Sequence, residues 1–279
     1  MDQKNAKIWL ITGISSGLGE ALAQSVMENG DFVVGTFRKT DQVENFNQKH
    51  AGRALALKLD ITQTKDIQNT FKTIQEKFGR LDVLVNNAGV GFAGAIEETD
   101  IEETRKVFET NFFGVLEMTR VFLPLFREQK SGHILQISSH SGIKGFPGFG
   151  IYSASKFALE GFSEALAQEI APLGIKLTLV EPGPFRTNFA SESLGMAQIV
   201  LADYQATAGV FRERIKGIHG KQEGDPQKAA QAIIRIVHSE NPPLRLPLGK
   251  IALATISSKL ESVQNDLNNY REIAEGAVF

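Results

Sequence analysis

The chain has 279 residues, a formal net charge of −2 and an ordinary globular composition, with 42% hydrophobic and 22% charged residues. This charge balance gives no electrostatic basis for binding nucleic acid or an anionic membrane surface, and we expect neither partner. The sequence contains no cysteine, which excludes disulfides and thiolate chemistry. Its first residues, MDQKNAKIWLITG, hold too short an apolar run for a signal peptide, and no stretch approaches the length of a membrane span. We expect a cytoplasmic protein.

Short runs rich in Val, Ile and Leu alternate with stretches of helical period over the first 182 residues. The runs are 7–12, 31–37, 53–59, 81–86, 132–138 and 175–181. They are nearly continuous in apolar residues, as is typical of parallel strands covered on both faces. The helical stretches between them are 17–29, 64–78, 100–128 and 152–172. This alternation predicts an α/β fold, a doubly wound parallel sheet of the Rossmann type with about seven strands and helices on both faces.

The regular alternation of strand-like and helical stretches ends after residue 182. Residues 183–225 show no clear strand and predict an excursion beyond the sheet that contributes to a substrate site. A helix then restarts at Pro226 with Asp225 as its N-cap, residues 244–249 read as an edge strand, and the tail is helical. No linker or repeat interrupts the chain, so we predict a single domain over 1–279, with 226–279 supplying C-terminal helices and the edge strand.

The turn after the first strand reads TGISSGLG and carries three glycines, Gly13, Gly17 and Gly19. Glycines at such a turn let the backbone approach a pyrophosphate, and the helix N-terminus offers free N–H groups to it. The spacing G-x-x-x-G-x-G differs from the G-x-G-x-x-G fingerprint, and a glycine-rich turn without a ligand is the alternative. Its place between a strand and a helix favours dinucleotide binding.

The second strand ends in GTFRKT, where an NAD-binding protein would carry an acidic residue for the adenosine ribose. Phe37 stands at that place and the cations Arg38 and Lys39 follow it. A guanidinium matches the geometry of a phosphate, so the pattern favours NADP(H) over NAD(H). A solvated basic loop is the alternative.

Several further motifs follow in a fixed order: LD at 59–60, NNAG at 86–89, Asn111, ISS at 137–139, YSASK at 152–156 and PGPFRT at 182–187. With TGISSGLG, this ordered set resembles the short-chain dehydrogenase/reductase family over almost the whole chain. In pattern the chain is most similar to the hydroxysteroid and retinol dehydrogenase-like members and to bacterial carbonyl reductases. The resemblance implies a catalytic tetrad, namely Asn111, Ser139, Tyr152 and Lys156.

The same resemblance implies a set of cofactor-binding residues along the chain. They are Gly13, Ser15, Ser16, Gly17, Leu18, Gly19, Arg38, Asp60, Ile61, Asn87, Ala88, Gly89, Tyr152, Lys156, Pro182, Gly183, Phe185 and Thr187. In this assignment Asp60 contacts the adenine and Thr187 the nicotinamide carboxamide.

The tetrad has a chemical rationale for converting a ketone or aldehyde into an alcohol and back. Ser139 can hydrogen-bond the substrate oxygen, and Tyr152 can transfer the proton. Lys156 lies one helical turn after Tyr152, and we expect its charge to lower the pKa of the tyrosine. The resemblance implies that Asn111 kinks its helix and anchors a water leading to Lys156.

An apolar wall over the nicotinamide is expected from Phe146, Phe149, Phe189, Leu194, Met196 and Tyr204. A hydrophobic small-molecule carbonyl or alcohol is therefore the expected substrate. The five histidines, including His219, show no spacing suited to a metal. By resemblance, the helices at 100–128 and 152–172 predict a homodimer or homotetramer.

Two other functions share parts of this pattern. A catalytically silent NADP(H)-sensing protein would keep the fold, but it would have no need of the Ser139, Tyr152 and Lys156 set. A nucleotide-sugar epimerase or dehydratase uses the same tyrosine and lysine pair, but it normally carries a G-x-x-G-x-x-G turn and a larger C-terminal substrate domain.

Overall fold

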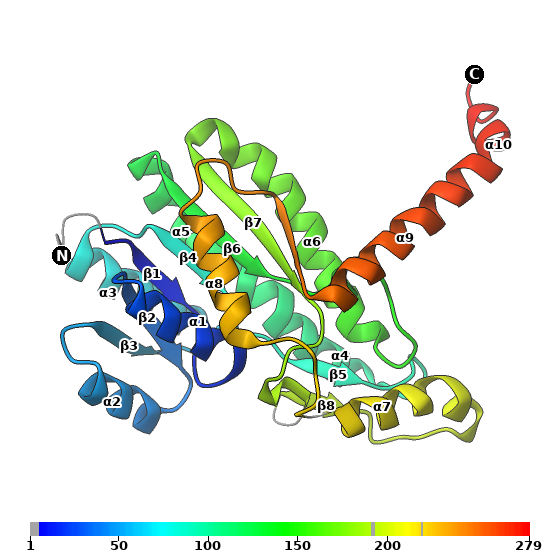
Figure 1. Ribbon diagram of the computed structural model, residues 1–279, viewed down its shortest axis with the longest axis horizontal. Helices are drawn as coiled ribbons and strands as arrows, with labels where there is room; N and C mark the ends of the chain where they lie inside the picture. The colour runs from blue at the N-terminus through cyan, green and yellow to red at the C-terminus, as the bar shows by residue number, and fades with distance from the viewer. Residues whose placement is uncertain (1–5, 191–192, 219) are drawn as a thin grey trace.

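A computed structural model describes residues 6–190, 193–218 and 220–279. Within these ranges seven parallel strands form one central sheet (Figure 1). In spatial order they are β3 (Ala54–Lys58), β2 (Phe32–Phe37), β1 (Ile8–Ile11), β4 (Val83–Asn86), β6 (Gly132–Ile137), β7 (Ile175–Pro182) and β9 (Arg245–Leu248). The structure therefore confirms the doubly wound parallel sheet and the edge strand predicted near residue 245.

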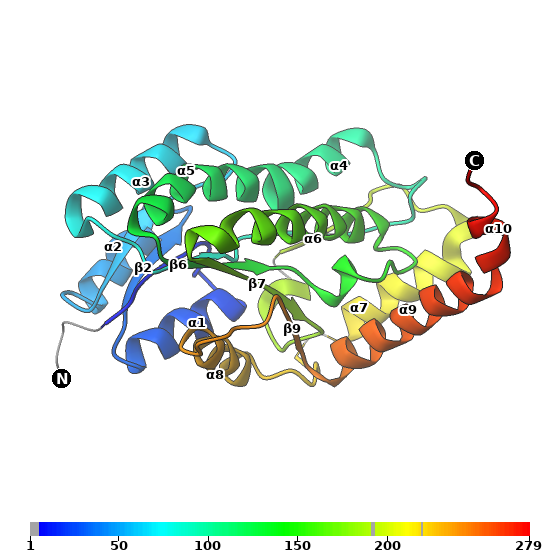
Figure 2. The same ribbon diagram turned by 90° about the horizontal axis from the view of Figure 1, so that it is seen from above.

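Helices cover both faces of the sheet, as Figure 2 shows from above. One face carries α3 (Thr64–Phe78), α4 (Ile101–Phe108), α5 (Gly114–Gln129) and α6 (Gly150–Ile170). The other carries α1 (Gly17–Glu28), α2 (Thr40–Lys49) and α8 (Pro226–Val237). Asp225 caps α8, because its carboxylate accepts hydrogen bonds from the N–H groups of Gln227 and Lys228.

The continuous apolar strands are explained by burial on both sides. Trp9, Leu10 and Ile11 of β1 are all fully buried. Leu10 packs in the core beneath α3, α5 and α6, whereas Trp9 and Ile11 pack in the core beneath α1 and α8. Successive side chains of a strand point to opposite faces, so a strand between two helical layers needs apolar residues at every position.

All strands run in the same direction, so their carboxyl ends lie along one edge of the sheet. The pairs Asn86 with Gln136 and Pro182 with Leu248 lie at or near these ends. In open α/β sheets, ligands bind in the crevice outside the carboxyl ends of the strands. The predicted motifs at Gly13, Asp60 and Ser139 each follow a strand at this edge.

The structure differs from the sequence prediction in two segments. The predicted helix at 100–128 is divided by a π-helical turn, η2 (Glu109–Phe113), between α4 and α5. The excursion at 183–225, of which residues 191–192 and 219 lie outside the described ranges, holds a short strand, β8 (Leu194–Met196), and α7 (Val210–Ile218). β8 pairs in parallel with β5 (Gly91–Ala93), so the excursion is attached to the segment after β4.

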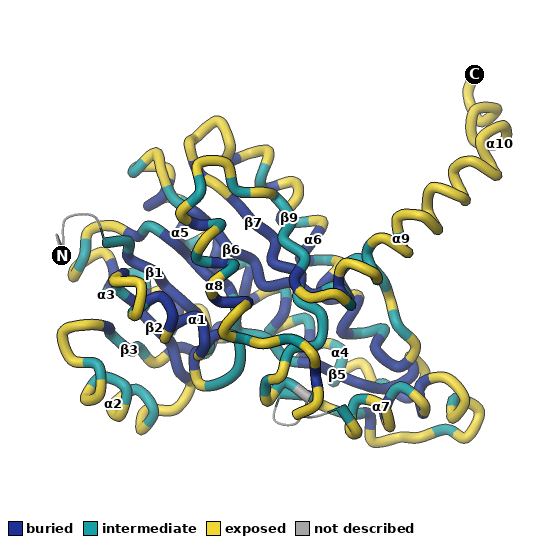
Figure 3. Tube along the Cα trace, in the orientation of Figure 1, coloured by how far each residue is buried: buried dark blue, intermediate teal, exposed yellow. Residues whose placement is uncertain are grey.

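The chain ends in α9 (Lys250–Asn269) and α10 (Arg271–Glu275), which extend away from the sheet and its helices in Figure 1. Coloured by burial in Figure 3, this arm is almost entirely exposed. Among the described residues of α9, Ala252 alone is buried. The predicted helical tail is thus present, and it packs on the rest of the chain only at its base.

Candidate active site

The glycine-rich turn between β1 and α1 has the backbone shape that a pyrophosphate site requires. Gly13 and Gly17 have φ values of 70° and 68°, which side-chain-bearing residues rarely adopt. A Cβ on Gly19 would lie 2.4 Å from Nδ2 of Asn87 and 2.5 Å from the carbonyl oxygen of Gly13. Ser16 precedes α1 without capping it through its side chain, so the first-turn N–H groups can bind an anion. These features fit a dinucleotide.

Thr12 fastens the NNAG segment to this turn. Its hydroxyl oxygen accepts hydrogen bonds of 2.9 Å from the N–H groups of both Asn87 and Ala88. The Asn87 side chain donates to the carbonyl oxygens of Thr12 at 2.8 Å and Gly13 at 3.0 Å. The predicted cofactor residues of the two motifs therefore lie together, and Thr12 is a supporting residue that the sequence reasoning did not single out.

The end of β2 presents the predicted cations to solvent. Phe37 is buried and packs against Phe46, with ring centroids 5.4 Å apart, while Arg38 and Lys39 are exposed. At the end of β3, Asp60 accepts hydrogen bonds from Thr62 N–H at 3.0 Å and Thr62 Oγ1 at 2.8 Å. These interactions hold the Asp60 carboxylate in a fixed turn at the same edge of the sheet.

Ile61 and Gly89 show how closely the helices approach this edge. A Cβ on Gly114 of α5 would lie 2.6 Å from the carbonyl oxygen of Ile61. A Cβ on Gly89 would lie 3.3 Å from Oδ1 of Asn111 and 3.7 Å from Nζ of Lys156. Gly89 therefore lies directly beside two members of the predicted tetrad.

Tyr152 and Lys156 lie in the first two turns of α6, and both are buried. Nζ of Lys156 is 5.9 Å from the centroid of the Tyr152 ring and donates a 2.8 Å hydrogen bond to the carbonyl oxygen of Ile137. Ser139 follows β6, and its Oγ accepts a 3.0 Å hydrogen bond from Ser141 N–H. The structure thus brings Ser139, Tyr152 and Lys156 together at the carboxyl end of β6.

Burial determines the acid–base properties of this group. It raises the pKa of Tyr152 to about 12, against a smaller lowering by a hydrogen bond with Ser139. It also lowers the pKa of Lys156 to about 8, against the attraction of Glu160 one turn further along α6. The expectation was that Lys156 lowers the pKa of Tyr152. In the structure this pKa is instead raised, because removing the phenol from water outweighs the hydrogen bond with Ser139.

Asn111 lies in the π-helical turn η2 and is fully buried. Its side-chain amide donates to the carbonyl oxygen of Val90 at 2.9 Å and to Oγ of Ser155 at 3.0 Å, and its Oδ1 accepts from Val90 N–H at 2.9 Å. A π-turn within a helix is frequently found at functional sites. Asn111 therefore ties the segment after β4 to α6, close to Tyr152.

The PGPFRT loop leaves the end of β7 and returns toward the glycine-rich turn. Gly183 N–H donates to the carbonyl oxygen of Leu248 at 2.9 Å, and Phe185 forms an isolated parallel bridge with Gly224. A Cβ on Gly17 would lie 3.3 Å from Cβ of Thr187. Pro182 to Thr187 therefore close the edge of the site opposite the NNAG segment.

Aromatic side chains enclose Tyr152. The Tyr152 ring centroid is 4.3 Å from that of Phe149 and 5.7 Å from that of Phe189. The ring of Phe211 in α7 lies tilted against that of Phe149, with the centroids 5.1 Å apart. The whole cluster comprises Ala93, Phe146, Phe149, Tyr152, Phe189, Leu194, Met196, Phe211 and Ile215.

This cluster contains five of the six residues expected to form the apolar wall. Tyr204 is the exception, because it is only partly buried and its hydroxyl donates to the Glu97 carboxylate at 2.6 Å. Phe211 and Ile215 were missed in the sequence. Their spacing of four residues, which places them on one face of a helix, was the available signal.

A buried ion pair anchors α7 over the site. Arg212 donates to Glu98 at 2.5 Å, and both side chains are at least 93% buried. Glu98 also accepts hydrogen bonds from the N–H groups of Ala95 at 2.8 Å and Leu201 at 2.9 Å. Every oxygen of this carboxylate therefore has a partner, and the excursion is held to the segment after β5.

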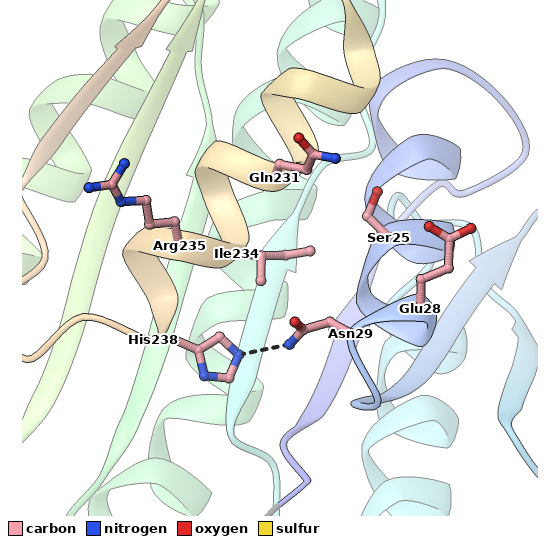
Figure 4. A pocket seen from close by; sticks show the side chains of 7 residues that line it. All are labelled: Ser25, Glu28, Asn29, Gln231, Ile234, Arg235 and His238. Atoms are coloured by element: carbon pink, nitrogen blue, oxygen red, sulfur yellow. Dashed lines mark hydrogen bonds between the residues drawn. The ribbon is translucent and has the colours of Figure 1, made fainter.

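A hollow on the far side of the molecule carries none of the predicted site residues. Figure 4 shows it between α1 and α8, lined by Ser25, Glu28, Asn29, Gln231, Ile234, Arg235 and His238. Asn29 and His238 approach to 3.5 Å there, and His238 also lies 3.1 Å from the Asp31 carboxylate. These contacts join the ends of α1 and α8 at the edge of the sheet away from Tyr152.

The described part of the chain offers neither a cluster of metal ligands nor a membrane-spanning helix. No group of three or more His, Asp and Glu side chains in that part of the chain is arranged to hold a metal ion, with His219 outside it. None of the helices described combines the length and apolar character needed to cross a bilayer.

The sequence model of the short chain dehydrogenase family matches residues 7–197. The chain belongs to the short-chain dehydrogenase/reductase family. Oxidoreductase BOA17 of Botryotinia fuckeliana is 39% identical over 96% of this chain and 98% of its own length. A 3-ketodihydrosphingosine reductase of Bacteroides thetaiotaomicron is 37% identical over 95% and 96%, and human retinol dehydrogenase 8 is 35% identical over 85% and 79%. The protein is thus related to oxidoreductases.

Solved structures agree with this membership. A short-chain dehydrogenase from Streptomyces avermitilis superposes with a TM-score of 0.92 at 41% identity, covering 99% of both chains. ElxO with NADP bound has a TM-score of 0.74 at 29% identity over 89% of this chain and 99% of its own. A 3-ketoacyl-(acyl-carrier-protein) reductase from Brucella melitensis complexed with NADH has a TM-score of 0.73 at 26% identity over 87% and 96%. Members of this family thus bind either nicotinamide nucleotide.

Proposed function

We propose that the protein is an NADP(H)-dependent oxidoreductase that interconverts a hydrophobic ketone or aldehyde and the corresponding alcohol. The observation that carries the proposal is the position of Tyr152. Its ring is buried among Phe149 and Phe189, beside Lys156 and after the Ser139 turn, at the sheet edge that holds the glycine-rich turn. A phenol in this setting can meet a bound carbonyl while bulk water is excluded.

In the proposed reduction each residue acts on the substrate oxygen. Ser139 donates a hydrogen bond to the carbonyl oxygen and stabilises the negative charge that develops there. Tyr152 transfers its proton to that oxygen, and Lys156 stabilises the phenolate left behind. A nicotinamide held at this sheet edge would supply the hydride to the carbonyl carbon, or would accept it in the reverse direction. The product alcohol thus gains one hydride and one proton.

The raised pKa of Tyr152 supports a role as the proton donor in reduction. With its pKa at about 12, Tyr152 carries its proton at neutral pH. The adjacent lysine, with a pKa of about 8, is mainly charged there and offsets the charge of the phenolate. We propose that Asn111 fixes α6 and the segment after β4 in the arrangement that this transfer requires.

The preference for NADP(H) rests on the end of β2. A buried Phe37 replaces the acidic residue that would bind the ribose of NAD, and the exposed Arg38 can meet a 2′-phosphate. Gly13, Ser15, Ser16, Gly17, Leu18 and Gly19 would hold the pyrophosphate, Asp60 and Ile61 the adenine, and Asn87, Ala88 and Gly89 the central part. Pro182, Gly183, Phe185 and Thr187 would cover the nicotinamide.

Steady-state kinetics of Arg38→Ala with both nucleotides tests this preference. We expect kcat/KM for NADPH to fall about tenfold, the order of one charge-assisted contact, with little change for NADH. Lys49→Ala, an exposed cation at the far end of α2, is the matched control and should change neither value. A wild-type enzyme that uses NADH better than NADPH, or an unchanged preference in Arg38→Ala, would contradict the proposal.

The hydrophobic substrate is supported by the aromatic wall around Tyr152. The names of two relatives, 3-ketodihydrosphingosine reductase and retinol dehydrogenase 8, refer to apolar molecules. NADPH oxidation over short aliphatic, long aliphatic, aromatic, steroid and sugar carbonyls should show the highest kcat/KM for the apolar members. Tight NADPH binding with no turnover across the panel would instead favour the catalytically silent sensor.

A single domain over 1–279 and assembly through the helices at 100–128 and 152–172 stay predictions. Phe113 and Phe157, both on these helices, are 50% and 44% exposed, which is consistent with such an interface. Sedimentation of the purified protein would test it.

A further inference from the structure

The α9–α10 arm is a helical extension that contacts the rest of the chain only at its base. Ala252 is buried there, Oγ1 of Thr255 lies 3.3 Å from Nδ1 of His140, and Lys144 Nζ donates to Ser258 Oγ at 3.5 Å. From residue 260 to the end of the chain every residue is exposed (Figure 3). A 20-residue helix is about 30 Å long, so most of α9 projects beyond these contacts (Figure 1).

One face of this arm is apolar along its length. Large apolar side chains recur at alternating intervals of three and four residues: Leu253, Ile256, Leu260, Val263, Leu267 and Tyr270. Leu260, Leu267 and Tyr270 are 62%, 59% and 60% exposed. We call these six residues the α9 stripe. Ile256 at the base is partly buried, but from Leu260 onward the stripe lies beyond the base contacts at 252, 255 and 258, so packing on the chain's own body does not explain it.

The spacing of the stripe indicates another helix as its partner. Intervals of three and four residues repeat every seven, which is the seam of two helices packed side by side. A contiguous apolar stripe left in water is unfavourable and marks an interaction surface. Residues 250–275 carry three basic and four acidic side chains, a balance that does not favour an anionic membrane surface.

The charges beside the stripe select a second copy of the same helix. Lys259 and Asp266 flank the stripe seven residues apart on one side, and in the described structure neither side chain has a hydrogen bond or ion-pair partner. When two copies of α9 lie antiparallel with Leu260 opposite Val263 of the other copy, Lys259 of each faces Asp266 of the other. The two-fold symmetry then gives two such ion pairs in the dimer, one at each Lys259.

We propose that α9 pairs with α9 of a second copy as an antiparallel, two-fold symmetric helix pair. In this register Ile256 faces Leu267 of the other copy and Leu253 faces Tyr270, so all six stripe residues are covered. Arg271, which would approach Lys250 of the other copy, is already paired with Glu275 at 3.2 Å within its own helix. The same surface is used by both copies, so the contact closes as a dimer.

This interface is separate from the one predicted through the helices at 100–128 and 152–172. If both interfaces form, each doubles the number of chains in the assembly. Loss of the α9 contact then halves the mass of the assembly. The α9 contact does not depend on the proposed oxidoreductase activity.

Molar mass by light scattering of the full-length protein tests the stripe. We expect Leu260→Lys to halve the mass of the wild-type assembly at micromolar concentration. Glu261→Lys, which introduces the same side chain one position away on the opposite face, should keep the wild-type mass. Unchanged circular dichroism and NADPH binding in both variants would exclude unfolding. A monomeric wild type, or a Leu260→Lys protein of unchanged mass, would overturn the proposal.

Cross-linking tests the antiparallel register without background, because the chain has no cysteine. Lys259→Cys and Asp266→Cys, co-expressed with different tags and treated with a short bis-maleimide, should give a cross-linked dimer containing both tags. Each variant alone should give at most one tenth of that yield. Equal yields in the single-variant samples would refute the antiparallel pairing.

Flotation with lipid vesicles tests a membrane as the alternative partner of the stripe. If the wild-type protein floated with the vesicles, and Leu260→Lys lost this flotation without a change in mass, the stripe would be assigned to a membrane and the proposal overturned.

Discussion

The two walls of the candidate active site are held in place by different interactions. On the nucleotide side, the backbone provides the shape through the positive φ values of Gly13 and Gly17, and the Thr12 and Asn87 side chains bond to neighbouring backbone groups. On the excursion side, β8 pairs with β5, and side chains hold α7 through the Arg212–Glu98 pair and the contact of Phe211 with Phe149. The first wall lies on the central sheet, and the second is attached to it through the β5–β8 pair, this ion pair and these rings.

Because of this difference, we expect substitutions in one wall to affect that wall without disrupting the other. A backbone-shaped turn tolerates few substitutions at its glycines but depends little on distant residues. The helix α7, which is held by one buried ion pair and a few rings, can be displaced by single substitutions. We therefore expect nucleotide binding to be insensitive to changes in α7, and substrate binding to be sensitive to them.

The largest effect should come from Arg212→Met, which leaves Glu98 buried without its cation. Removing one partner of a buried ion pair costs about 3–5 kcal/mol, and here that cost falls on the packing of α7. Hydrogen exchange of residues 205–218 should accelerate strongly, while the Kd for NADPH should change less than about threefold.

Arg214→Met on the same helix is the control, because Arg214 is exposed. It should leave hydrogen exchange unchanged. If Arg212→Met abolished NADPH binding as well, the two walls would not be independent.

The lowered pKa of Lys156 predicts how the stability of the protein depends on pH. Its pKa is about 8 in the folded protein and 10.5 in the reference state, so between these values the unfolded chain binds more protons at this site. The free energy of unfolding contributed by Lys156 therefore rises with pH across that range, by on the order of 3 kcal/mol in total.

Denaturant unfolding at pH 7.5, 8.5 and 9.5 would measure this contribution. The difference in stability between wild type and Lys156→Met should move in favour of the wild type as the pH rises. A difference that stays constant over this range would show that burial does not lower the pKa of Lys156.

A smaller effect is expected from Phe211→Ala, which removes an apolar ring from the wall around Tyr152. We expect KM for long apolar carbonyls to rise about tenfold, on the order of 1–2 kcal/mol of lost contact, with short carbonyls less affected. The affinity for NADPH should be unchanged. Equal losses for short and long substrates would place Phe211 outside the substrate site.

The same contrast explains how much the sequence predicted. The strands of the sheet and the helices between them were predicted because burial on both faces demands continuous apolar runs such as Trp9 to Ile11. Local signals predicted the glycine-rich turn and the Asp225 cap, since each depends on residues a few positions apart. The structure confirms the architecture and brings Ser139, Tyr152 and Lys156 together.

Features that depend on distant contacts were not predicted. β8 has three residues, and it forms because it pairs with β5, about 100 positions earlier. Arg212 is a core residue only because Glu98 is buried opposite it. The raised pKa of Tyr152 depends on rings from three separate segments that exclude water, whereas the sequence showed only a lysine one turn away.

The central claim is that Tyr152 transfers the proton, and single-turnover kinetics of Tyr152→Phe tests it most directly. The variant keeps the aromatic ring and removes only the hydroxyl, so NADPH binding measured by fluorescence should stay within about threefold of wild type. We predict that NADPH oxidation with an accepted apolar carbonyl falls by about 10²- to 10⁴-fold, the usual contribution of a positioned general acid. Turnover within tenfold of wild type in a variant that binds NADPH normally would contradict the account.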